Sequence, residues 1–60
     1  MVRILLVEDD PTVRETVAAY LTRAGYDVSA VGDGALALET YAASPADLVL
    51  LDLMLPTLGG

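Results

Sequence analysis

The sequence predicts an α/β fold in which three parallel strands alternate with two helices, and three observations support this prediction. Two short apolar runs, Arg3 to Val7 and Asp47 to Leu53, have the length and composition of strands that are covered on both faces. Between them, two segments carry apolar residues at helical spacing and enclose a third short strand. Strands that alternate with helices through short connections form parallel sheets with right-handed crossovers.

The first helix is predicted to begin at Pro11 and to end before Gly25. Proline suits the first turn of a helix, and Asp10 directly before it can accept hydrogen bonds from the free amides of that turn. Glycine is common at the point where a helix stops. The apolar positions expected to face the sheet are Val13, Val17, Tyr20, Leu21 and Ala24.

The second strand is predicted within residues 26–31, where the pattern is that of a shorter, partly exposed strand at a sheet edge. Asp33 is placed to cap the second helix, which is predicted from Ala35 to Ala43 and ends before Pro45. Leu36 lies outside the apolar stripe of that helix, so we expect it to be exposed or to contact something outside this fold. The stripe itself consists of Ala37, Leu38, Tyr41 and Ala42.

Composition and charge indicate which kinds of partner this protein is expected to bind. Nine acidic and three basic residues give a formal charge of −6, which argues against direct nucleic-acid binding because phosphate neutralisation needs clustered Lys and Arg. Apolar runs stay below the roughly 18 residues that span a bilayer and the start is unlike a signal peptide, so we expect a soluble cytoplasmic protein without membrane binding. Cysteine is absent and 55% of the residues are hydrophobic, so association is the expected source of added stability.

Acidic residues follow two of the predicted strands. Glu8, Asp9 and Asp10 come directly after the first strand, and Asp52 lies near the end of the third. Functional groups in open parallel sheets gather at the carboxyl ends of the strands, so these carboxylates converge if the two strands are neighbours. Carboxylates held together repel one another and favour a hard divalent cation such as Mg²⁺, beside which one of them can attack a phosphoryl group.

A simpler interpretation of these residues stays open. Asp9 and Asp10 can act merely as residues that cap the first helix and favour its dipole. Asp52 can be merely a solvating residue at the end of a strand.

Three blocks of sequence resemble the receiver domain of bacterial two-component response regulators, especially the transcription-factor type. They read RILLVEDDPTVRETV, VGDGALAL and DLVLLDLMLP followed by Gly60, in receiver-like order and spacing. Residues 1–60 correspond to about the N-terminal half of such a domain, so we expect a truncated receiver. The fold that the resemblance implies is flavodoxin-like, with three parallel strands in order 2-1-3, helices on both faces, and completion by oligomerisation.

The resemblance also implies roles for individual residues. Asp52 is similar to the phospho-accepting aspartate, while Glu8 and Asp9 resemble the acidic pair that positions Mg²⁺. Met54 would contribute its backbone carbonyl to the metal, and Asp10 remains a helix cap. The implied cofactor is Mg²⁺, and the implied partner of the parent protein is a histidine kinase.

Other receiver residues that assist phosphoryl transfer lie in the second half of the domain. They are a Ser or Thr and a Lys, and these 60 residues contain no Lys and no His. Arg3, Arg14 and Arg23 are predicted on the first strand and on the outer face of the first helix, where they would not replace the Lys. Loss of one electrostatic donor slows such reactions about 100-fold or more, so we expect impaired transfer.

A third strand without further neighbours would be an open sheet edge with apolar residues on both faces. Such edges pair with other chains, so we expect a homodimer or higher oligomer that joins third strand to third strand. Three functions remain open: a phospho-accepting signalling domain, a self-associating structural module, and a Mg²⁺-dependent phosphotransferase or phosphatase. The last is disfavoured because no general acid, Lys or phosphate-binding loop is evident, so we do not expect an enzyme.

Overall fold

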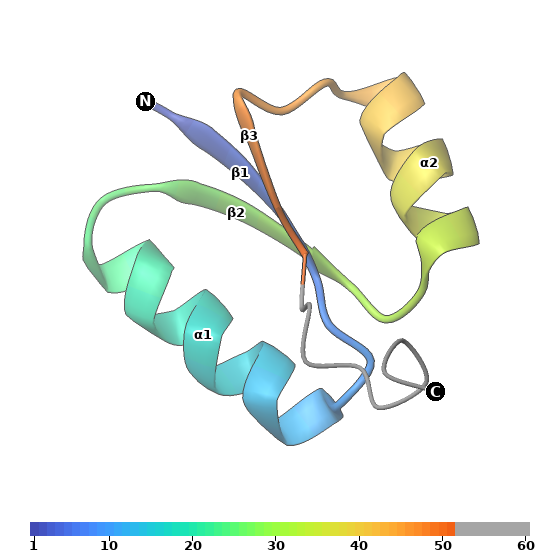
Figure 1. Ribbon diagram of the computed structural model, residues 1–60. Coiled ribbons are helices and arrows are strands. Elements are labelled where there is room, and N and C mark those ends of the chain that lie inside the picture. The colour runs from blue at the N-terminus through green and yellow to red at the C-terminus, as the bar shows by residue number, and fades with distance from the viewer. Residues whose placement is uncertain (52–60) are drawn as a thin grey trace.

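The structure of the protein is a computed structural model that describes residues 1–51. The five predicted elements are all present, close to their predicted bounds, whereas the last two positions of the predicted third strand lie outside the described residues. They are strand β1 at Arg3–Val7, helix α1 at Pro11–Arg23, strand β2 at Asp27–Val31, helix α2 at Gly34–Ala43 and strand β3 at Leu48–Leu51 (Figure 1).

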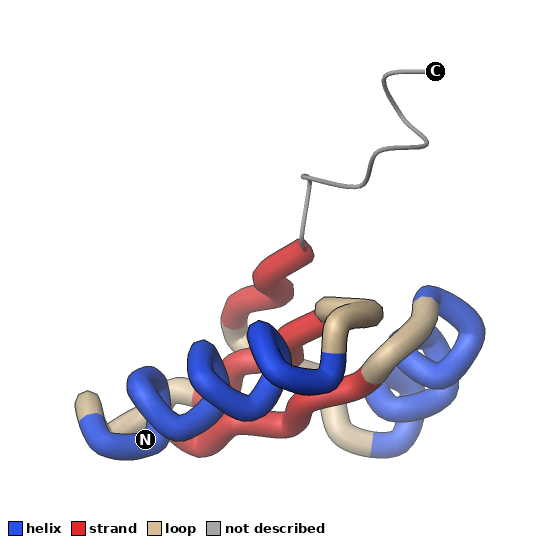
Figure 2. The backbone as a smooth tube through the Cα atoms, turned by 90° about the horizontal axis from the view of Figure 1, so that it is seen from below, coloured by secondary structure: helices blue, strands red, loops and turns tan. Residues whose placement is uncertain are grey.

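The three strands form one parallel sheet in the order β2-β1-β3, as expected. Helices α1 and α2 lie on opposite sides of this sheet (Figure 1). After a turn of 90° the two helices again lie apart, with strands between them (Figure 2). The central position of β1 means that the loop at its carboxyl end lies between the ends of the two other strands.

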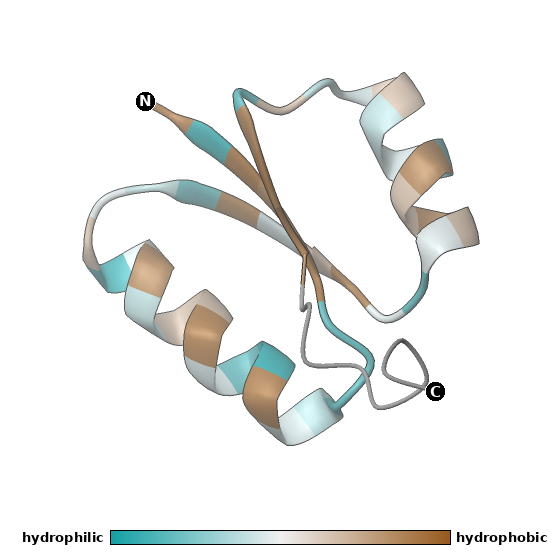
Figure 3. Ribbon diagram, viewed as in Figure 1, coloured by the Kyte–Doolittle hydropathy of each residue, from teal (hydrophilic) through white to brown (hydrophobic). Residues whose placement is uncertain are grey.

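The core is centred on β1. Ile4, Leu5 and Leu6 are at most 5% exposed, and Val31 at the end of β2 is also buried. Most residues of β1 and β3 are themselves apolar (Figure 3). The apolar run of β1 is therefore that of a strand covered on both faces, as its composition predicts.

Both helix starts carry the predicted aspartate caps. Asp10 Oδ1 accepts hydrogen bonds from the backbone N–H groups of Thr12 at 2.8 Å and Val13 at 3.2 Å. Asp33 Oδ1 accepts one from the backbone N–H of Leu36 at 2.7 Å. These bonds satisfy amides that have no partner within the helix.

The predicted buried stripes are partly wrong. Six of the residues that were expected to be buried against the sheet are exposed, most of all Tyr20 at 74% and Leu38 at 75%. The other four are Val13, Ala24, Tyr41 and Ala42. Leu38 lies on the side of α2 that faces the sheet, where it lines an open groove together with Leu5 and Val49, and this groove leaves most of its side chain exposed. Leu36 is 46% exposed, which agrees with its place outside the stripe.

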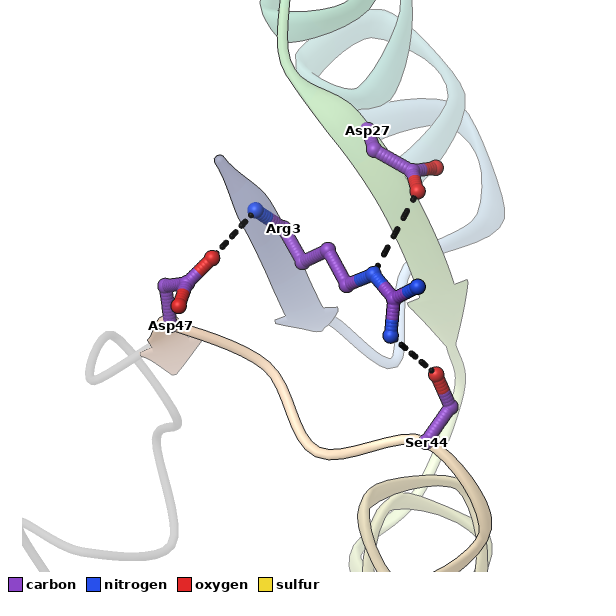
Figure 4. A network of polar contacts seen from close by, with 4 residues as sticks. All are labelled: Arg3, Asp27, Ser44 and Asp47. Atoms are coloured by element: carbon purple, nitrogen blue, oxygen red, sulfur yellow. Dashed lines mark hydrogen bonds and ion pairs between the residues drawn. The ribbon is translucent and has the colours of Figure 1, made fainter. Parts of the chain in front are cut away.

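Arg3 links the amino ends of the three strands to the carboxyl end of α2 (Figure 4). Its backbone N–H donates to Asp47 Oδ2 at 2.9 Å, and its Nη1 donates to Ser44 Oγ at 3.0 Å. Its Nε lies 3.8 Å from Asp27 Oδ2. Both side chains of this ion pair are more than half exposed, so solvent screens the pair and it contributes little to stability.

The two helices are short and carry charged residues. Within residues 1–51, neither α1 nor α2 is both long enough and apolar enough to cross a membrane.

Candidate functional site

Three consecutive acidic residues, Glu8, Asp9 and Asp10, connect β1 to α1, and we call them the acidic loop. The loop begins directly after Val7, the residue of β1 that is in register with the last residues of both neighbouring strands. The acidic loop therefore leaves the sheet at the carboxyl end of its central strand, where functional groups of open parallel sheets gather.

Glu8 is fixed by its backbone and by its side chain. Its N–H donates to the carbonyl oxygen of Val31 at 3.0 Å, which extends the ladder between β1 and β2 by one residue. Its Oε1 accepts a hydrogen bond from the backbone N–H of Asp10, also at 3.0 Å. The residue is 5% exposed, and a carboxylate at that depth needs such hydrogen bonds to offset its lost hydration.

The other two acids of the loop differ from Glu8 and from each other. The carboxylate of Asp10 caps α1 through its bonds to Thr12 and Val13, which confirms its predicted role. Asp9 is exposed, so its carboxylate can meet a cation from solvent without a large desolvation cost. Glu8 is thus a buried, hydrogen-bonded acid, whereas Asp9 is accessible to solvent.

The remaining predicted site residues, Asp52 and Met54, lie outside the described residues. The strand that precedes them, β3, is hydrogen-bonded to β1. This pairing meets the condition under which the acids after the two strands were expected to converge. Val7 is in register with Leu51, and these two residues directly precede Glu8 and Asp52 in the sequence. Proximity of the Glu8 and Asp52 side chains stays a prediction.

The acidic loop does not form a complete set of side-chain metal ligands by itself. Over the part of the chain that the structure describes, no group of three or more His, Cys, Asp or Glu residues could by itself hold a metal ion.

The prediction for Arg14 is wrong. Its side chain is partly buried, and its Nη1 donates to the carbonyl oxygen of Glu8 at 3.0 Å, instead of lying on the outer face of α1. Helical side chains point toward the N-terminus of their helix, so a long side chain one turn inside α1 can reach the loop that precedes it. That directional rule could have found the contact from the sequence, whereas sorting the helix by polarity could not.

Comparisons with known proteins agree with this arrangement. The family model described as "Response regulator receiver domain" matches residues 4–60. The transcriptional activator protein PfeR of Pseudomonas aeruginosa is 52% identical over 58 residues, which are 97% of this chain and 19% of PfeR. The DNA-binding response regulator MtrA of Mycolicibacterium smegmatis is 47% identical over 58 residues, which are 97% of this chain and 25% of MtrA.

A solved structure gives the same result for the fold. The crystal structure of histidine kinase ThkA in complex with response regulator protein TrrA contains a chain that is 38% identical to this one, with a TM-score of 0.81. The match covers 93% of this chain and 48% of that chain, so this chain spans less than half of its solved relative and at most about a quarter of the two curated relatives. With the family model matching nearly its full length, the chain belongs to the response regulator receiver domain family.

Proposed function

We propose that this chain carries the phosphoryl-accepting site of a two-component response regulator, with Asp52 as the acceptor and a histidine kinase as the partner of the parent protein. One observation supports the proposal above all others. The receiver match includes both the acidic loop and Asp52, and the strands that precede these two segments are paired neighbours in the sheet.

The available donors suit Mg²⁺. Glu8, Asp9 and Asp52 supply carboxylate oxygens, and Met54 supplies a backbone carbonyl, which together form the all-oxygen set that this ion prefers. In the described part of this set, Glu8 is buried and hydrogen-bonded, while Asp9 is exposed to solvent. Bound Mg²⁺ would neutralise negative charge on the phosphoryl oxygens.

The proposed covalent step uses a carboxylate oxygen of Asp52 as the nucleophile. That oxygen forms a bond to phosphorus, the bond between phosphorus and the donor breaks, and its electron pair leaves with the donor. The product is an acyl phosphate on Asp52. Because these 60 residues contain no Lys to bind the phosphoryl oxygens, we expect the isolated chain to react slowly. In this proposal the chain accepts a group and is not itself an enzyme.

Intact-mass spectrometry tests the proposal directly. The 60-residue chain is incubated with Mg²⁺ and acetyl phosphate as a small phosphodonor, and its mass is followed over time. We expect a slowly growing species heavier by one phosphoryl group, which is absent when Mg²⁺ is chelated and absent in Asp52→Asn. Phosphorylation at an equal rate in Asp52→Asn would contradict the assignment, as would a wild-type chain that stays unmodified at saturating donor.

A specific observation favours a second candidate function, self-association through β3. This strand lies at an edge of the described sheet, and Leu48, Val49 and Leu51 are 42 to 59% exposed. Beside it, an apolar groove of about 310 Å³ runs between α2 and the sheet, with Leu38 and Val49 in its lining. A second copy that pairs its own β3 around a two-fold axis would cover edge and groove together.

A further inference from the structure

We propose that Arg14 is a positioning residue that clamps the acidic loop between the ends of β1 and β2 and thereby sets the affinity of the site for Mg²⁺. The part of this proposal that concerns Mg²⁺ rests on the proposed function. The clamp itself rests on the contacts of Arg14 with Glu8 and Gly32.

The first contact fixes the backbone of the acidic loop. Arg14 Nη1 donates to the carbonyl oxygen of Glu8 at 3.0 Å, while the N–H of Glu8 donates to Val31 of β2 at the same distance. Both backbone polar groups of Glu8 are therefore engaged, one by β2 and the other by the guanidinium. The backbone that carries the acidic side chains cannot rotate without breaking one of these bonds.

The second contact involves the loop that follows β2. A Cβ atom added to Gly32 would lie 2.9 Å from Arg14 Nη1 and 3.7 Å from its Cζ, so the guanidinium rests against the glycine backbone. The backbone of Gly32 does not have a positive φ, since Gly25 alone among the described glycines has one. A Cβ at this position would therefore displace the guanidinium from its place against the loop, without straining the described backbone.

Helix stability does not explain a cation at this position. Arg14 lies about one turn from the N-terminus of α1, and a positive charge near that end opposes the helix dipole. Arg23 in the last turn of α1 has the favourable placement. The location of Arg14 is instead accounted for by the charge-assisted hydrogen bond that it donates to the acidic loop.

Fixing the loop matters for Mg²⁺ because this ion demands near-ideal octahedral geometry. Residues that orient metal ligands without touching the metal change its affinity by about 10- to 100-fold when they are replaced. Arg14 holds the backbone of Glu8, which is directly followed by the accessible Asp9, so loss of the clamp loosens both proposed ligands at once.

The test is a Mg²⁺ titration of the 60-residue chain, followed by the NMR shifts of backbone amides in the acidic loop. We expect Arg14→Gln and Arg14→Lys each to weaken binding about 10-fold. Gly32→Ala should weaken binding by a smaller factor, because the added Cβ meets only the end of the flexible Arg14 side chain, which can shift while the arginine stays in place. Arg14→Lys separates positioning from charge, because lysine keeps the charge but lacks the planar fork of arginine. If Arg14 acted through charge alone, Arg14→Lys would bind like the wild type and Arg14→Gln would bind more tightly.

A double-mutant cycle tests the second contact. The described atoms within 4 Å of the added Cβ both belong to Arg14, so Gly32→Ala should have almost no further effect in an Arg14→Gln background. Gly34→Ala is the matched control, since nothing lies within 4 Å of a Cβ at Gly34. Arg23→Gln removes the same charge from the other end of α1 and should leave Mg²⁺ affinity unchanged.

Folding of each variant is checked by circular dichroism, and affinities are compared at equal folded fraction. Should the Arg14 variants not fold, Gly32→Ala still tests the clamp, because it keeps the arginine and displaces it. Additive losses in the cycle, or wild-type affinity in both Arg14→Lys and Gly32→Ala, would overturn the clamp while leaving the proposed function intact. A wild-type chain that binds no Mg²⁺ would instead overturn the proposed function, and with it the role of Arg14 at the metal.

Discussion

Val7 of β1 is in parallel register with Leu51 of β3. This pairing connects two segments that are more than forty residues apart in the sequence, and each partner directly precedes an acid of the proposed site, Glu8 or Asp52. A parallel sheet brings the carboxyl ends of adjacent strands to one edge, so the arrangement of the strands explains how distant acids can serve one site.

The cap of α1 is expected to stabilise the whole domain. Asp10→Ala removes the carboxylate that accepts from Thr12 and Val13, and we expect it to lower the free energy of unfolding by about 1 kcal/mol. Asp10→Asn keeps a capping oxygen and is the control, with little expected loss. Urea unfolding monitored by circular dichroism measures both. Equal stability of Asp10→Ala and the wild type would contradict the capping role.

Leu5 and Leu38 are expected to differ in their contribution to stability, because only Leu5 is buried. Leu5 is 2% exposed at the centre of β1, so Leu5→Ala should cost about 2–5 kcal/mol, which is enough to unfold a domain of this length. Leu38 is 75% exposed, and Leu38→Ala should change stability by less than about 0.5 kcal/mol. Thermal unfolding at a low protein concentration compares the two. A large loss in Leu38→Ala would indicate that another molecule covers this side chain.

The end of α1 requires an unusual backbone conformation. Gly25 has a φ of +102°, and a Cβ at this position would meet nothing within 4 Å. Gly25→Ala should therefore destabilise the domain through backbone strain alone, by about 1–2 kcal/mol. Gly34→Ala, in a helix and without a positive φ, should not destabilise it. Chemical unfolding of both variants tests this difference, and equal effects would contradict the strain argument.

Self-association is expected to depend on β3. In sedimentation at micromolar concentration the wild-type chain should be a dimer or a higher oligomer, and Leu48→Lys should shift it toward monomer, because a charge would be buried at the new interface. Tyr20→Lys adds the same charge on α1, across the sheet from α2, and should leave the oligomer unchanged. A folded wild-type monomer would rule out this association.

Much of the fold could be predicted from the sequence because its signals are local. The apolar run of β1, the proline and aspartate at the start of α1 and the glycine after it each act through neighbouring residues. The strand order came from the family resemblance, since periodicity does not say which strands pair. Exposure of Tyr20 and Leu38 could not be read from helical spacing, because spacing defines a stripe and not the width of the surface that covers it.

The sequence predicts the acidic residues of the candidate site, but it does not predict the contacts that support them. The position of Glu8 and Asp9 at the carboxyl end of a strand follows from their place after an apolar run, whereas the central place of that strand in the sheet follows from the family resemblance. The contact between Arg14 and Glu8 was missed, because it joins a helix to the preceding loop through a long side chain that polarity alone assigns to solvent. Gly32 carried no sequence signal of its own, since its space is used by a side chain from another element.

One measurement tests the shared site most directly: a Mg²⁺ titration of the wild-type chain and of Asp52→Asn, followed by the amide shifts of Glu8, Asp9 and Leu51. We predict that these amides shift together along one saturating curve in the wild type, and that Asp52→Asn weakens that curve at least about tenfold, because it removes a charged ligand. Shifts in the acidic loop that are the same in Asp52→Asn as in the wild type would show that the two strand ends do not share a metal, and would contradict the proposed site.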